Sequence, residues 1–428
     1  MRTYPDSVRF LYSLGNEMRT AKLGLDRIQV LLGELGHPER AGRFIHVAGT
    51  NGKGSVCAMV ESALREAGYR TGLYISPHLV EPVERIQIGG RPVSEAQFVQ
   101  AFEEVHAAAE HLLRREALEA HPSYFETVTA MAFLLFRRLG VEIVVLETGL
   151  GGRLDATNVV QPELAAITPI DFDHERYLGN SIESIAREKA GILKPGAPTV
   201  FARQRPEALR VLEQRAAELG IPVAHTSCWR LTSLELDRDG HRSVVEGRNG
   251  TIRLECPLAG EHQVENALTA TAMLELLTVP VEAIERGIRQ TRWPGRLERV
   301  AQAPEIVLDG AHNPAGVRAL ATHIRRFYAG RPIWIIFGAL RDKSLDEIAG
   351  LLAPLADRII LTNPNSHRAV RAELLEAFFD HPAVEVAPSV EDALERAAAA
   401  PTEAAIFITG SLMLVGEARK LLLPAYAV

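Results

Sequence analysis

Cysteine is scarce in this sequence, and so are long apolar runs. The three cysteines, Cys57, Cys228 and Cys256, lie far apart and show no C-x-x-C spacing. They cannot form a disulfide framework or a zinc site of their own, so a reducing cytoplasm is expected. No apolar run approaches the length of a membrane span, and the segment MRTYPDSVRFLYSLG lacks the basic-then-apolar pattern of a signal peptide. We therefore expect a soluble protein with no membrane contact.

Excess basic charge is also absent, which argues against a surface built for nucleic acid. The chain has 54 acidic and 47 basic residues, a net charge of −7. Its composition, with 47% hydrophobic and 24% charged residues, is that of a globular protein. At 428 residues it is too long for one ordinary core, so two domains are expected and three are possible. We expect a monomer whose partners are small molecules.

Short β-branched runs alternate with helical stretches, which indicates βαβ units and a mostly parallel sheet. Two stretches, 54–68 and 127–140, are predicted to be helices that end at glycines. The first half contains these predicted strands: 43–49, 72–76, 142–147, 164–168 and 198–202. The fold class expected from this rhythm is α/β.

The pattern changes twice further along the chain. Residues 223–258 alternate in polarity and contain Asp-Gly and Asn-Gly turns, which predicts a small antiparallel subdomain or hairpin. Residues 261–277 return to helix. The segment 291–300 is the best domain boundary, because Pro294-Gly295 interrupts both periodicities. A second α/β series follows it, with predicted strands at 305–310, 332–340, 358–363 and 405–411.

Polar residues follow nearly every predicted strand. In open α/β sheets, ligands bind beyond the carboxyl ends of the strands. These residues lie at 49–51, 76–78, 147–149 and 171–174 in the first half, and at 309–313, 341–343 and 366–368 in the second. We therefore expect two domains that turn their functional edges toward one cleft.

The stretch FIHVAGTNGKGSV (44–56) is similar to a phosphate-binding loop but departs from the pattern G-x-x-x-x-G-K-[ST]. Lys53 is followed by Gly54, Ser55 comes one place late, and Val47 stands where the first glycine is expected. A predicted strand precedes it and a helix follows, an arrangement that suits phosphate. The alternative is a Gly-rich turn with a solvated lysine. We predict a nucleotide site, with Lys53 on the terminal phosphates, at Thr50, Asn51, Gly52, Lys53, Gly54 and Ser55.

Three side chains at strand ends form a candidate metal site. Glu147 ends an apolar strand, where an ionised carboxylate is costly without a cation. Ser76 and His174 follow other strands and could join it beside the phosphates. A strand-end cap for Ser76, a buried salt bridge for Glu147 and a core histidine for His174 remain alternatives. Histidine is an unusual magnesium ligand, so zinc or manganese is a further option.

The segment GLGGRLDATNV (149–159) contains a G-x-G after a strand. Leu154 stands in place of the third glycine and no helix pattern follows, so we reject a dinucleotide site. The glycines are expected to let the loop pass close to a substrate.

Motifs of one known family occur along almost the whole chain. In order they are KLGLDRI (22–28), HVAGTNGKGSV (46–56), ISPHL (75–79), SYFETVTAMAF (123–133), LETGLGGRLDATNV (146–159), DHERYLG (173–179), IAREKAGILK (185–194), GEHQVENALTA (260–270), WPGRLE (293–298), LDGAHNP (308–314), GALRDKS (338–344) and GSLMLVGEAR (410–419). Together they resemble the folate branch of the Mur ligase superfamily, folylpolyglutamate synthase and dihydrofolate synthase. The resemblance implies an ATP-binding domain at 1–293, a hinge at 294–297 and a Rossmann-like glutamate ligase domain at 298–428.

The resemblance also implies metal-binding roles. Ser76, Glu147 and His174 match positions that hold magnesium in the family. Lys189 matches a lysine that is often carbamylated, a change that turns a cation into a carboxylate able to help hold a second metal. From the sequence alone, Lys189 would be a surface helix lysine in an i, i+4 pair.

Further implied roles concern the nucleotide. Asp309 matches a residue that accepts from the ribose hydroxyls of ATP, and Gln263 matches one near adenine, with Asn266 as a second possibility. The guanidinium of Arg296 suits phosphate by geometry and charge. The alternatives are an exposed hinge arginine, a helix-capping aspartate and ordinary helix amides.

The substrate positions are implied by the same resemblance. Leu154, Asp155 and Ala156 match a segment near the pterin. His312 is a candidate contact for glutamate. The dihydropteroate site of bifunctional bacterial members matches Lys22, Leu23, Tyr124 and Phe125, imperfectly at Lys22, where those members can have an acid.

We predict an ATP-dependent ligase that uses Mg²⁺. Transfer of the γ-phosphoryl group to a folate carboxylate gives an acyl phosphate, which the amine of L-glutamate attacks. The candidate catalytic residues are Lys53, His174 and Lys189. The acceptor is dihydropteroate, dihydrofolate or an already glutamylated tetrahydrofolate, and we predict both the folylpolyglutamate synthase and the dihydrofolate synthase activity.

Two other classes remain open. A Mur-type peptidoglycan ligase should add a UDP-binding domain, yet only residues 1–43 precede the loop. A regulatory nucleotide-binding module of the GTPase kind should carry an N-K-x-D motif, and the sequence has none.

Overall fold

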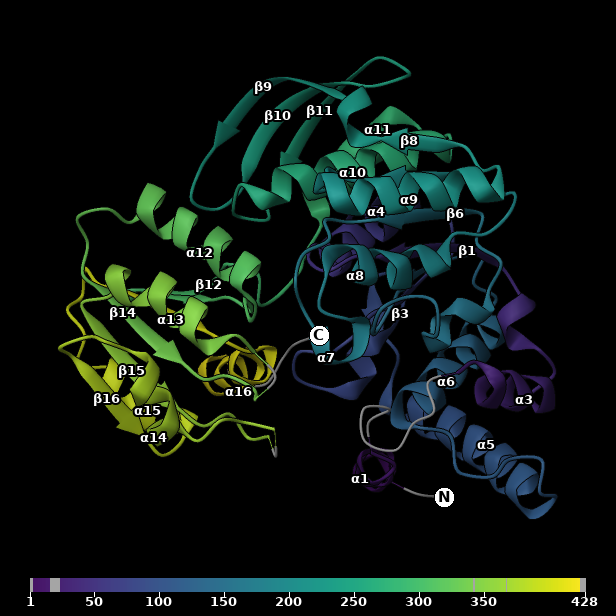
Figure 1. The fold of residues 1–428 in the computed structure, drawn as a ribbon, viewed down its shortest axis with the longest axis horizontal. Coiled ribbons are helices and arrows are strands. Elements are labelled where there is room, and N and C mark those ends of the chain that lie inside the picture. Colours follow the sequence, from purple (N-terminus) through teal and green to yellow (C-terminus); the bar gives the residue numbers. More distant parts are fainter. Residues whose placement is uncertain (1–2, 16–23, 342, 367, 424–428) are drawn as a thin grey trace.

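The computed structural model describes residues 3–15, 24–341, 343–366 and 368–423. Lys22 and Leu23 lie outside the described residues. The chain forms two lobes (Figure 1). We call the elements from α1 (Tyr4–Ser13) to α11 (Val281–Gln290) the N-terminal lobe, and those from β12 (Glu298–Gln302) to α16 (Leu412–Leu422) the C-terminal lobe.

The N-terminal lobe is built on an eight-stranded sheet with the order β4-β3-β2-β5-β1-β6-β7-β8. The six strands from β2 to β8 in this order are parallel, and β3 and β4 form an antiparallel edge. The strands are β1 (Arg43–Ala48), β2 (Thr71–Tyr74), β3 (Ile86–Ile88), β4 (Arg91–Pro92), β5 (Ile143–Glu147), β6 (Leu164–Ile167), β7 (Thr199–Phe201) and β8 (Val223–His225).

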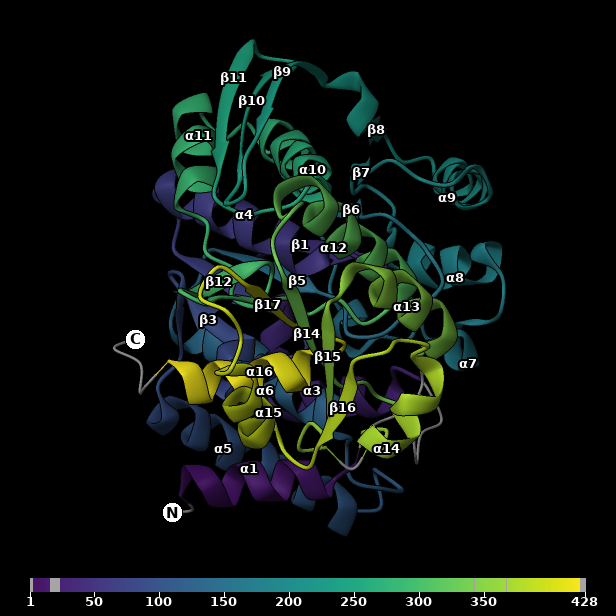
Figure 2. The same ribbon diagram turned by 90° about the vertical axis from the view of Figure 1, so that its left-hand side faces the viewer.

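Helices cover both faces of this sheet, as a parallel sheet requires. Successive residues of β5 alternate between two cores, with Val145 in one and Leu146 in the other. The first core lies under α4, α10 and α11, and the second under α5 and α6 (Figure 2). The helices are α3 (Asp26–Glu34), α4 (Lys53–Glu66), α5 (Glu95–Arg114), α6 (Tyr124–Arg138), α7 (Glu175–Leu178), α8 (Ile182–Lys189), α9 (Pro206–Leu219) and α10 (His262–Leu276).

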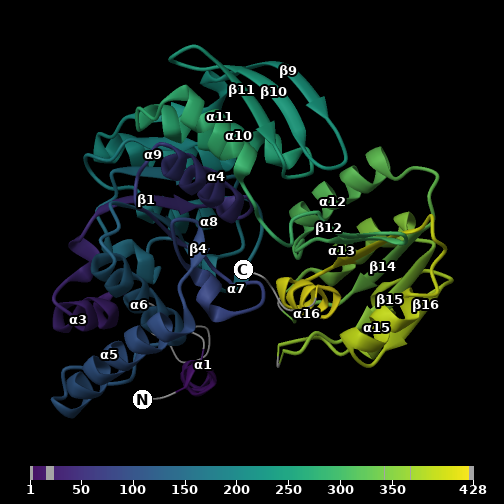
Figure 3. The same ribbon diagram turned by 180° about the vertical axis from the view of Figure 1, so that it is seen from behind.

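A three-stranded antiparallel sheet lies over α10 and α11 (Figure 3). Its strands are β9 (Arg230–Leu236), β10 (His241–Glu246) and β11 (Thr251–Cys256). The alternating side chains of β11, such as Ile252 and Leu254, bury one face against these helices. The predicted start at residue 223 is wrong, because β8 pairs in parallel with β7 and belongs to the large sheet.

The C-terminal lobe has a six-stranded sheet with the order β12-β13-β17-β14-β15-β16. Among its described strands, β12 pairs antiparallel with β13 and the other pairs are parallel. The strands after β12 are β13 (Glu305–Leu308), β14 (Ile333–Phe337), β15 (Arg358–Thr362), β16 (Val384–Ala387) and β17 (Ala405–Thr409). Its other helices are α12 (Pro314–Phe327), α13 (Leu345–Leu352), α14 (Ala372–Leu375) and α15 (Val390–Ala397).

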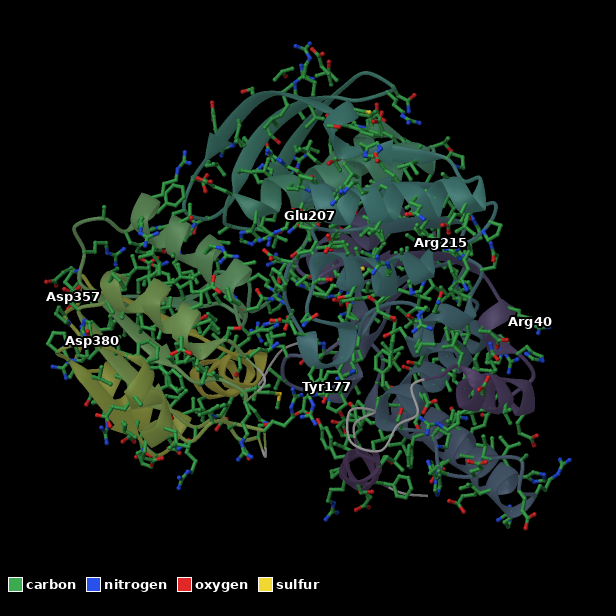
Figure 4. All side chains as sticks on the ribbon, viewed as in Figure 1. Arg40, Tyr177, Glu207, Arg215, Asp357 and Asp380 are labelled. Carbon is green, nitrogen blue, oxygen red and sulfur yellow. The ribbon has the colours of Figure 1, made fainter. Side chains whose placement is uncertain are left out.

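The parallel strands of both lobes begin on the outside of the molecule. Arg40 precedes β1 and Asp357 precedes β15, and the two lie toward opposite edges (Figure 4). The carboxyl ends of the two sheets therefore point toward the region between the lobes. The sequence prediction that both functional edges face a common region agrees with this arrangement.

Candidate active site

The loop between β1 and α4 is bent so that it presents the start of α4 to an anion. Gly49 and Gly52 have φ angles of 151° and 87°, and a Cβ atom at Gly49 would lie 1.8 Å from Oγ1 of Thr168. Within the described residues, no side chain caps the N terminus of α4. Nζ of Lys53 lies 3.2 Å from the carbonyl oxygen of Gly49 and 3.1 Å from that of Thr50. This geometry fits the predicted phosphate site. We call residues 49–55 the phosphate loop, after that predicted role.

Steric contact explains why a glycine follows Lys53. A Cβ atom at Gly54 would lie 2.6 Å from Cζ2 of Trp293, well inside van der Waals contact. The indole occupies the space that a serine or threonine side chain would need at position 54. Ser55 is 4% exposed and accepts a hydrogen bond from Nε2 of Gln263 at 3.2 Å. The late hydroxyl therefore lies in the first turn of α4, against α10.

Restoring the usual pattern with Gly54→Ser should damage the protein. The new side chain must displace Trp293, and overpacking of this kind costs about 1–3 kcal/mol. We expect a lower midpoint of thermal unfolding and weaker binding of a nonhydrolysable ATP analogue by calorimetry. Gly350→Ser is the control, because a Cβ atom there meets nothing within 4 Å. Stability and binding like those of the parent chain in Gly54→Ser would contradict the steric explanation.

Two amides of α10 support the loop. Nδ2 of Asn266 donates to Oε1 of Gln263 at 2.9 Å, and both side chains are buried. A Cβ atom at Gly52 would lie 2.2 Å from Oδ1 of Asn266, so the loop backbone runs directly against this amide. Both residues thus contact the phosphate loop, and their contact with adenine stays a prediction.

Glu147, the last residue of β5, and Ser76, two residues after β2, lie together at the carboxyl edge of the sheet. Oε2 of Glu147 accepts a hydrogen bond from the backbone N–H of Ser76 at 3.2 Å, and Glu147 is 6% exposed. Burial raises the pKa of Glu147, although the charges of Lys53 and Arg296 act to lower it. The hydroxyl of Ser76 is buried and has no hydrogen-bond partner among the described residues. This carboxylate and unsatisfied hydroxyl form a donor set that fits a hard divalent cation.

Lys189 is buried beside the same loop. Its Nζ donates to the carbonyl oxygen of Gly49 at 2.7 Å, and the residue is 4% exposed. Burial lowers the pKa of Lys189 to about 7, and the charge of Lys53 adds to the effect. The alternative of a solvated surface lysine is therefore wrong. A large fraction of this amine is neutral at neutral pH, and the neutral amine is the form that reacts with CO₂.

Asp173 joins the two lobes. Its Oδ1 lies 2.7 Å from Nζ of Lys343, and its Oδ2 accepts a hydrogen bond from Nδ2 of Asn313 at 3.0 Å. Burial would raise the pKa of Asp173, but its interaction with His312 and the charge of Lys343 hold it well below its usual range. Asn313 also exchanges hydrogen bonds with the amide of Asn51. The C-terminal lobe thus contacts the phosphate loop directly.

The two histidines of the site both lie near Asp173. Nε2 of His174 is 3.9 Å from Oδ1 of Asp173, and Nε2 of His312 is 3.6 Å from Oδ2. Nδ1 of His312 lies 2.8 Å from the carbonyl oxygen of Gly310, which orients the ring. Metal binding by His174 and glutamate binding by His312 stay predictions.

Asp309 and Arg296 hold the connection between the lobes. The carboxylate of Asp309 accepts hydrogen bonds from the backbone N–H groups of Leu297 and Ala311, both at 3.0 Å. Burial raises the pKa of Asp309, and the charge of Arg296 opposes this. Nη1 of Arg296 would lie 3.0 Å from a Cβ atom at Gly310. Arg296 is thus packed against the second lobe, and contacts of either residue with ATP stay predictions.

An aromatic and cationic cluster lies at the start of α6. The Tyr124 ring stacks on Tyr12 with centroids 5.5 Å apart, and the guanidinium of Arg85 lies 5.0 Å from the Tyr124 centroid. A Cβ atom at Gly149 would lie 2.5 Å from Cζ of Phe125, so this ring packs directly on the loop after β5. Tyr124 and Phe125 therefore lie beside the predicted substrate loop.

The substrate loop is shaped by Asp155. Its Oδ2 accepts hydrogen bonds from the N–H groups of Gly149 and Leu150, both at 2.8 Å, and its Oδ1 accepts one from Thr157 at 3.1 Å. The carboxylate is thus committed to the loop backbone. Ala156 is buried and Leu154 is half-buried, and contact of this segment with a pterin stays a prediction.

Two solved structures and a sequence relative resemble the whole chain. A dihydrofolate synthase/folylpolyglutamate synthase of Bacillus subtilis is 36% identical and covers 93% of this chain and 95% of its own. Mycobacterium tuberculosis folylpolyglutamate synthase, solved with ADP and AMPPCP, has a TM-score of 0.91 at 35% identity, covering 99% of each chain. Escherichia coli FolC, solved with DHPP and ADP, has a TM-score of 0.88 at 30% identity, also covering 99% of each.

Two family descriptions also match. The Mur ligase middle domain matches residues 47–274, and the Mur ligase glutamate ligase domain matches residues 295–412. The chain is a Mur ligase of the folylpolyglutamate and dihydrofolate synthase family. The predicted family, α/β fold, ATP use and ligase class are thereby confirmed over the peptidoglycan and regulatory alternatives. Within the part of this Mur ligase that the structure describes, no helix is both long and apolar enough to cross a membrane.

Sequence reasoning gave no role to a buried cation in this Mur ligase, Arg85. Its Nε donates to Nδ1 of His78 at 2.9 Å, which leaves Nε2–H of His78 to donate to the hydroxyl of Tyr12 at 3.2 Å. Burial and the charge of Arg85 lower the pKa of His78 to about 3, so this histidine is neutral. The charge of Arg85 also acts to lower the pKa of Glu147. Only the fold reveals this role, because no residue pattern marks Arg85.

A pocket of about 550 Å³ adjoins the phosphate loop. The carbonyl oxygen of Pro169, one of its lining residues, accepts a hydrogen bond from the N–H of Thr50 at 3.0 Å. Leucines of β9, Val264, Glu265 and Leu268 of α10, and Arg326 of α12 also line it. The pocket is therefore built from both lobes.

Proposed function

We propose that this ligase joins the amine of L-glutamate to the carboxylate of a folate, with ATP as the energy source. The acceptors are tetrahydrofolate or its polyglutamates, and dihydropteroate as a second substrate. One observation carries the proposal. A glycine-rich loop at the start of α4, a buried carboxylate and a buried lysine with a lowered pKa meet at the sheet ends of one lobe, in direct contact with the other lobe.

The residues suit activation of an acid by phosphoryl transfer. A carboxylate is a poor acyl donor, so its oxygen attacks the γ-phosphorus of ATP and ADP leaves, which gives an acyl phosphate. The glutamate amine then attacks the acyl carbon and phosphate leaves, with loss of a proton. The positive charges of Lys53 and Arg296 neutralise negative charge on the phosphates. Contacts between the lobes, such as the ion pair of Asp173 with Lys343, hold the two lobes in place.

A divalent cation completes the site in this proposal. The buried hydroxyl of Ser76 and the carboxylate of Glu147 would hold it, with His174 as a third candidate. When bound, Mg²⁺ would neutralise charge on the phosphates during transfer. Carbamylated Lys189 would add a further anionic ligand beside Gly49.

We place the adenosine part of ATP in the pocket between the lobes. The pocket has room for a nucleoside and adjoins the phosphate loop through Pro169. Val264 and Leu268 offer apolar walls, and Arg326 reaches in from the C-terminal lobe. Gln263 and Asn266 lie on the neighbouring side of α10, and Asp309 is the candidate for the ribose.

Glu147→Gln should raise stability and lower turnover. The ordinary pKa of this carboxyl is 4.5, and burial raises it in the folded chain. As pH rises above 4.5, the unfolded state releases the proton first, so the parent chain loses stability while the glutamine variant does not. The difference in unfolding midpoint should therefore grow with pH. We expect kcat to fall by about a hundredfold or more, because a metal ligand is lost.

Glu61→Gln is the matched control for this experiment. Burial also raises the pKa of Glu61, which lies away from the loop and bonds Thr71. Its variant should show the same pH trend in stability with unchanged dependence of the rate on Mg²⁺. Normal turnover and Mg²⁺ dependence in Glu147→Gln would contradict the metal site.

The lobes provide a hinge for closure over the substrates. We place the ATP-binding domain at 1–293, the hinge at 294–297 and the glutamate ligase domain at 298–428. Gly295 and Leu297 have positive φ angles of 73° and 48°. This left-handed backbone, which non-glycine residues rarely adopt, supports a hinge at 294–297. L-glutamate would bind mostly to the C-terminal lobe, with His312 as a candidate contact.

We further propose a cytoplasmic monomer. The three cysteines are free, two of them buried, which supports a reducing compartment.

The assignment is tested by incubating the pure protein with ATP, Mg²⁺, labelled L-glutamate and either tetrahydrofolate or dihydropteroate. We expect label in a folate product together with ADP and phosphate in equal amounts. Label that enters only UDP-muramyl substrates would refute the folate assignment. ATP hydrolysis without an amide product would refute the ligase mechanism.

A further inference from the structure

Three potential metal ligands meet on the α5 side of the N-terminal lobe. His106 and Glu110 lie one helical turn apart on α5, and His121 lies in the segment that leads to α6. One ligand atom from each residue lies within 4.8 Å of the other two. Nε2 of His121 is 3.9 Å from Oε1 of Glu110. None of the three belongs to the strand-end site described above.

The local hydrogen bonding prepares His121 for a cation. Its Nδ1 lies 3.1 Å from the carbonyl oxygen of Pro122, so Nδ1 carries the proton and donates it. Nε2 then presents a lone pair toward Glu110, and this buried nitrogen has no hydrogen-bond partner among the described residues. A histidine that donates one ring N–H to a backbone carbonyl is the arrangement by which proteins orient metal-bound imidazoles.

Aromatic rings hold the two imidazoles in place. The ring of Phe10, from α1, lies 4.6 Å from the His106 ring and 5.7 Å from the His121 ring, between centroids. Phe102 stacks on His106 at 5.5 Å, with an angle of 7° between the planes. The two imidazoles are 5.6 Å apart. Packing of this kind restricts the rings and lowers the entropy lost when a ligand is bound.

We propose that His106, Glu110 and His121 bind a divalent transition-metal ion of the zinc class. Two imidazoles and one carboxylate are a ligand set that zinc accepts, with a fourth position left for water. Magnesium and calcium prefer oxygen ligands, so the two imidazoles select against them. The bound ion would tie α5 to the segment before Ser123, which caps α6 and precedes Tyr124.

The test is a Zn²⁺ titration of metal-free protein by calorimetry, in excess Mg²⁺ and with an ATP analogue present. We expect the parent chain to bind one more equivalent of Zn²⁺ than His121→Ala or Glu110→Gln. Loss of a direct ligand should weaken binding at this site by about a hundredfold or more, beyond the loss seen for outer partners. His111→Ala is the matched control, because His111 is an exposed histidine of the same helix.

Crystals soaked in Zn²⁺ place the ion independently of any variant. Anomalous scattering at the zinc edge should give a peak between His106, Glu110 and His121. Saturating Zn²⁺ should also raise the unfolding midpoint of the parent chain and of His111→Ala, but raise that of His121→Ala less.

Three results would overturn the proposal. They are equal Zn²⁺ stoichiometry and affinity in the parent chain, His121→Ala and Glu110→Gln, an anomalous peak only at other residues, or the same loss of binding in His111→Ala. None of these depends on ligase activity, so the metal proposal and the folate assignment can fail separately.

Discussion

Replacing Lys53 with methionine should lower kcat/KM for ATP by about a thousandfold or more. The Lys53 amine lies at the mouth of the phosphate loop, where it is held by the carbonyl oxygens of Gly49 and Thr50. It can turn from these carbonyls to the terminal phosphates, where negative charge moves during transfer. Methionine keeps the length of the side chain and removes the charge. Initial rates of glutamate incorporation, measured against ATP concentration, give the effect.

Lys194→Met is the matched control for Lys53→Met. Lys194 is also partly buried and also donates to a backbone carbonyl, that of Asn158 at 3.2 Å. This variant should keep its rate within about threefold, since ordinary substitutions away from the site change stability more than chemistry. Activity of Lys53→Met close to that of the parent chain would show that the loop does not hold the reacting phosphates.

Replacing Lys189 with alanine should have a comparable effect, about a thousandfold on kcat. The reason is chemical. A buried amine with a pKa of about 7 is neutral often enough to take up CO₂, and the carbamate supplies the anionic group that a metal beside Gly49 requires. Small carboxylates such as acetate should restore part of the activity, because they fit the space left by the side chain and replace the lost charge.

The carbamate itself can be observed by ¹³C NMR with labelled bicarbonate. The neutral fraction of Lys189 grows as pH rises through about 7, so the carbamate signal should be present at alkaline pH and should fade in acid. Lys189→Arg should give no such signal, since a guanidinium stays charged. Full activity of Lys189→Ala, or absence of the signal under bicarbonate in the parent chain, would show that Lys189 acts only as a buried amine.

The sheet and much of the phosphate site could be predicted from the sequence because their causes are local. β-branched runs mark the strands, and residues such as Glu147 stand at their carboxyl ends, so the topology of parallel sheets places them at one edge. The need for glycine at position 54 could not be predicted in this way. The side chain of Trp293 leaves no room for a Cβ atom at this position. Trp293 lies far away in the chain, and no periodic pattern pairs it with the loop.

The contacts between the lobes could not be predicted for the same reason. Asp173 and Lys343 are 170 positions apart, and only the folded chain brings them to 2.7 Å. The burial of Lys189 could not be predicted from the sequence either, because the amphipathic pattern of its helix is equally compatible with a solvated lysine. The structure adds Arg85 and His78 as buried neighbours of Tyr124 and Tyr12. His78 lies in the motif ISPHL, where the sequence gave it no role, and Arg85 lies in no motif.

The central claim is that the site makes an acyl phosphate from a folate carboxylate. The most direct measurement supplies folate with ¹⁸O in the reacting carboxyl group, together with ATP, Mg²⁺ and L-glutamate, and follows the isotope by mass spectrometry. The account predicts that each amide formed transfers one ¹⁸O atom to the inorganic phosphate. Amide formation that leaves the phosphate without ¹⁸O would contradict it.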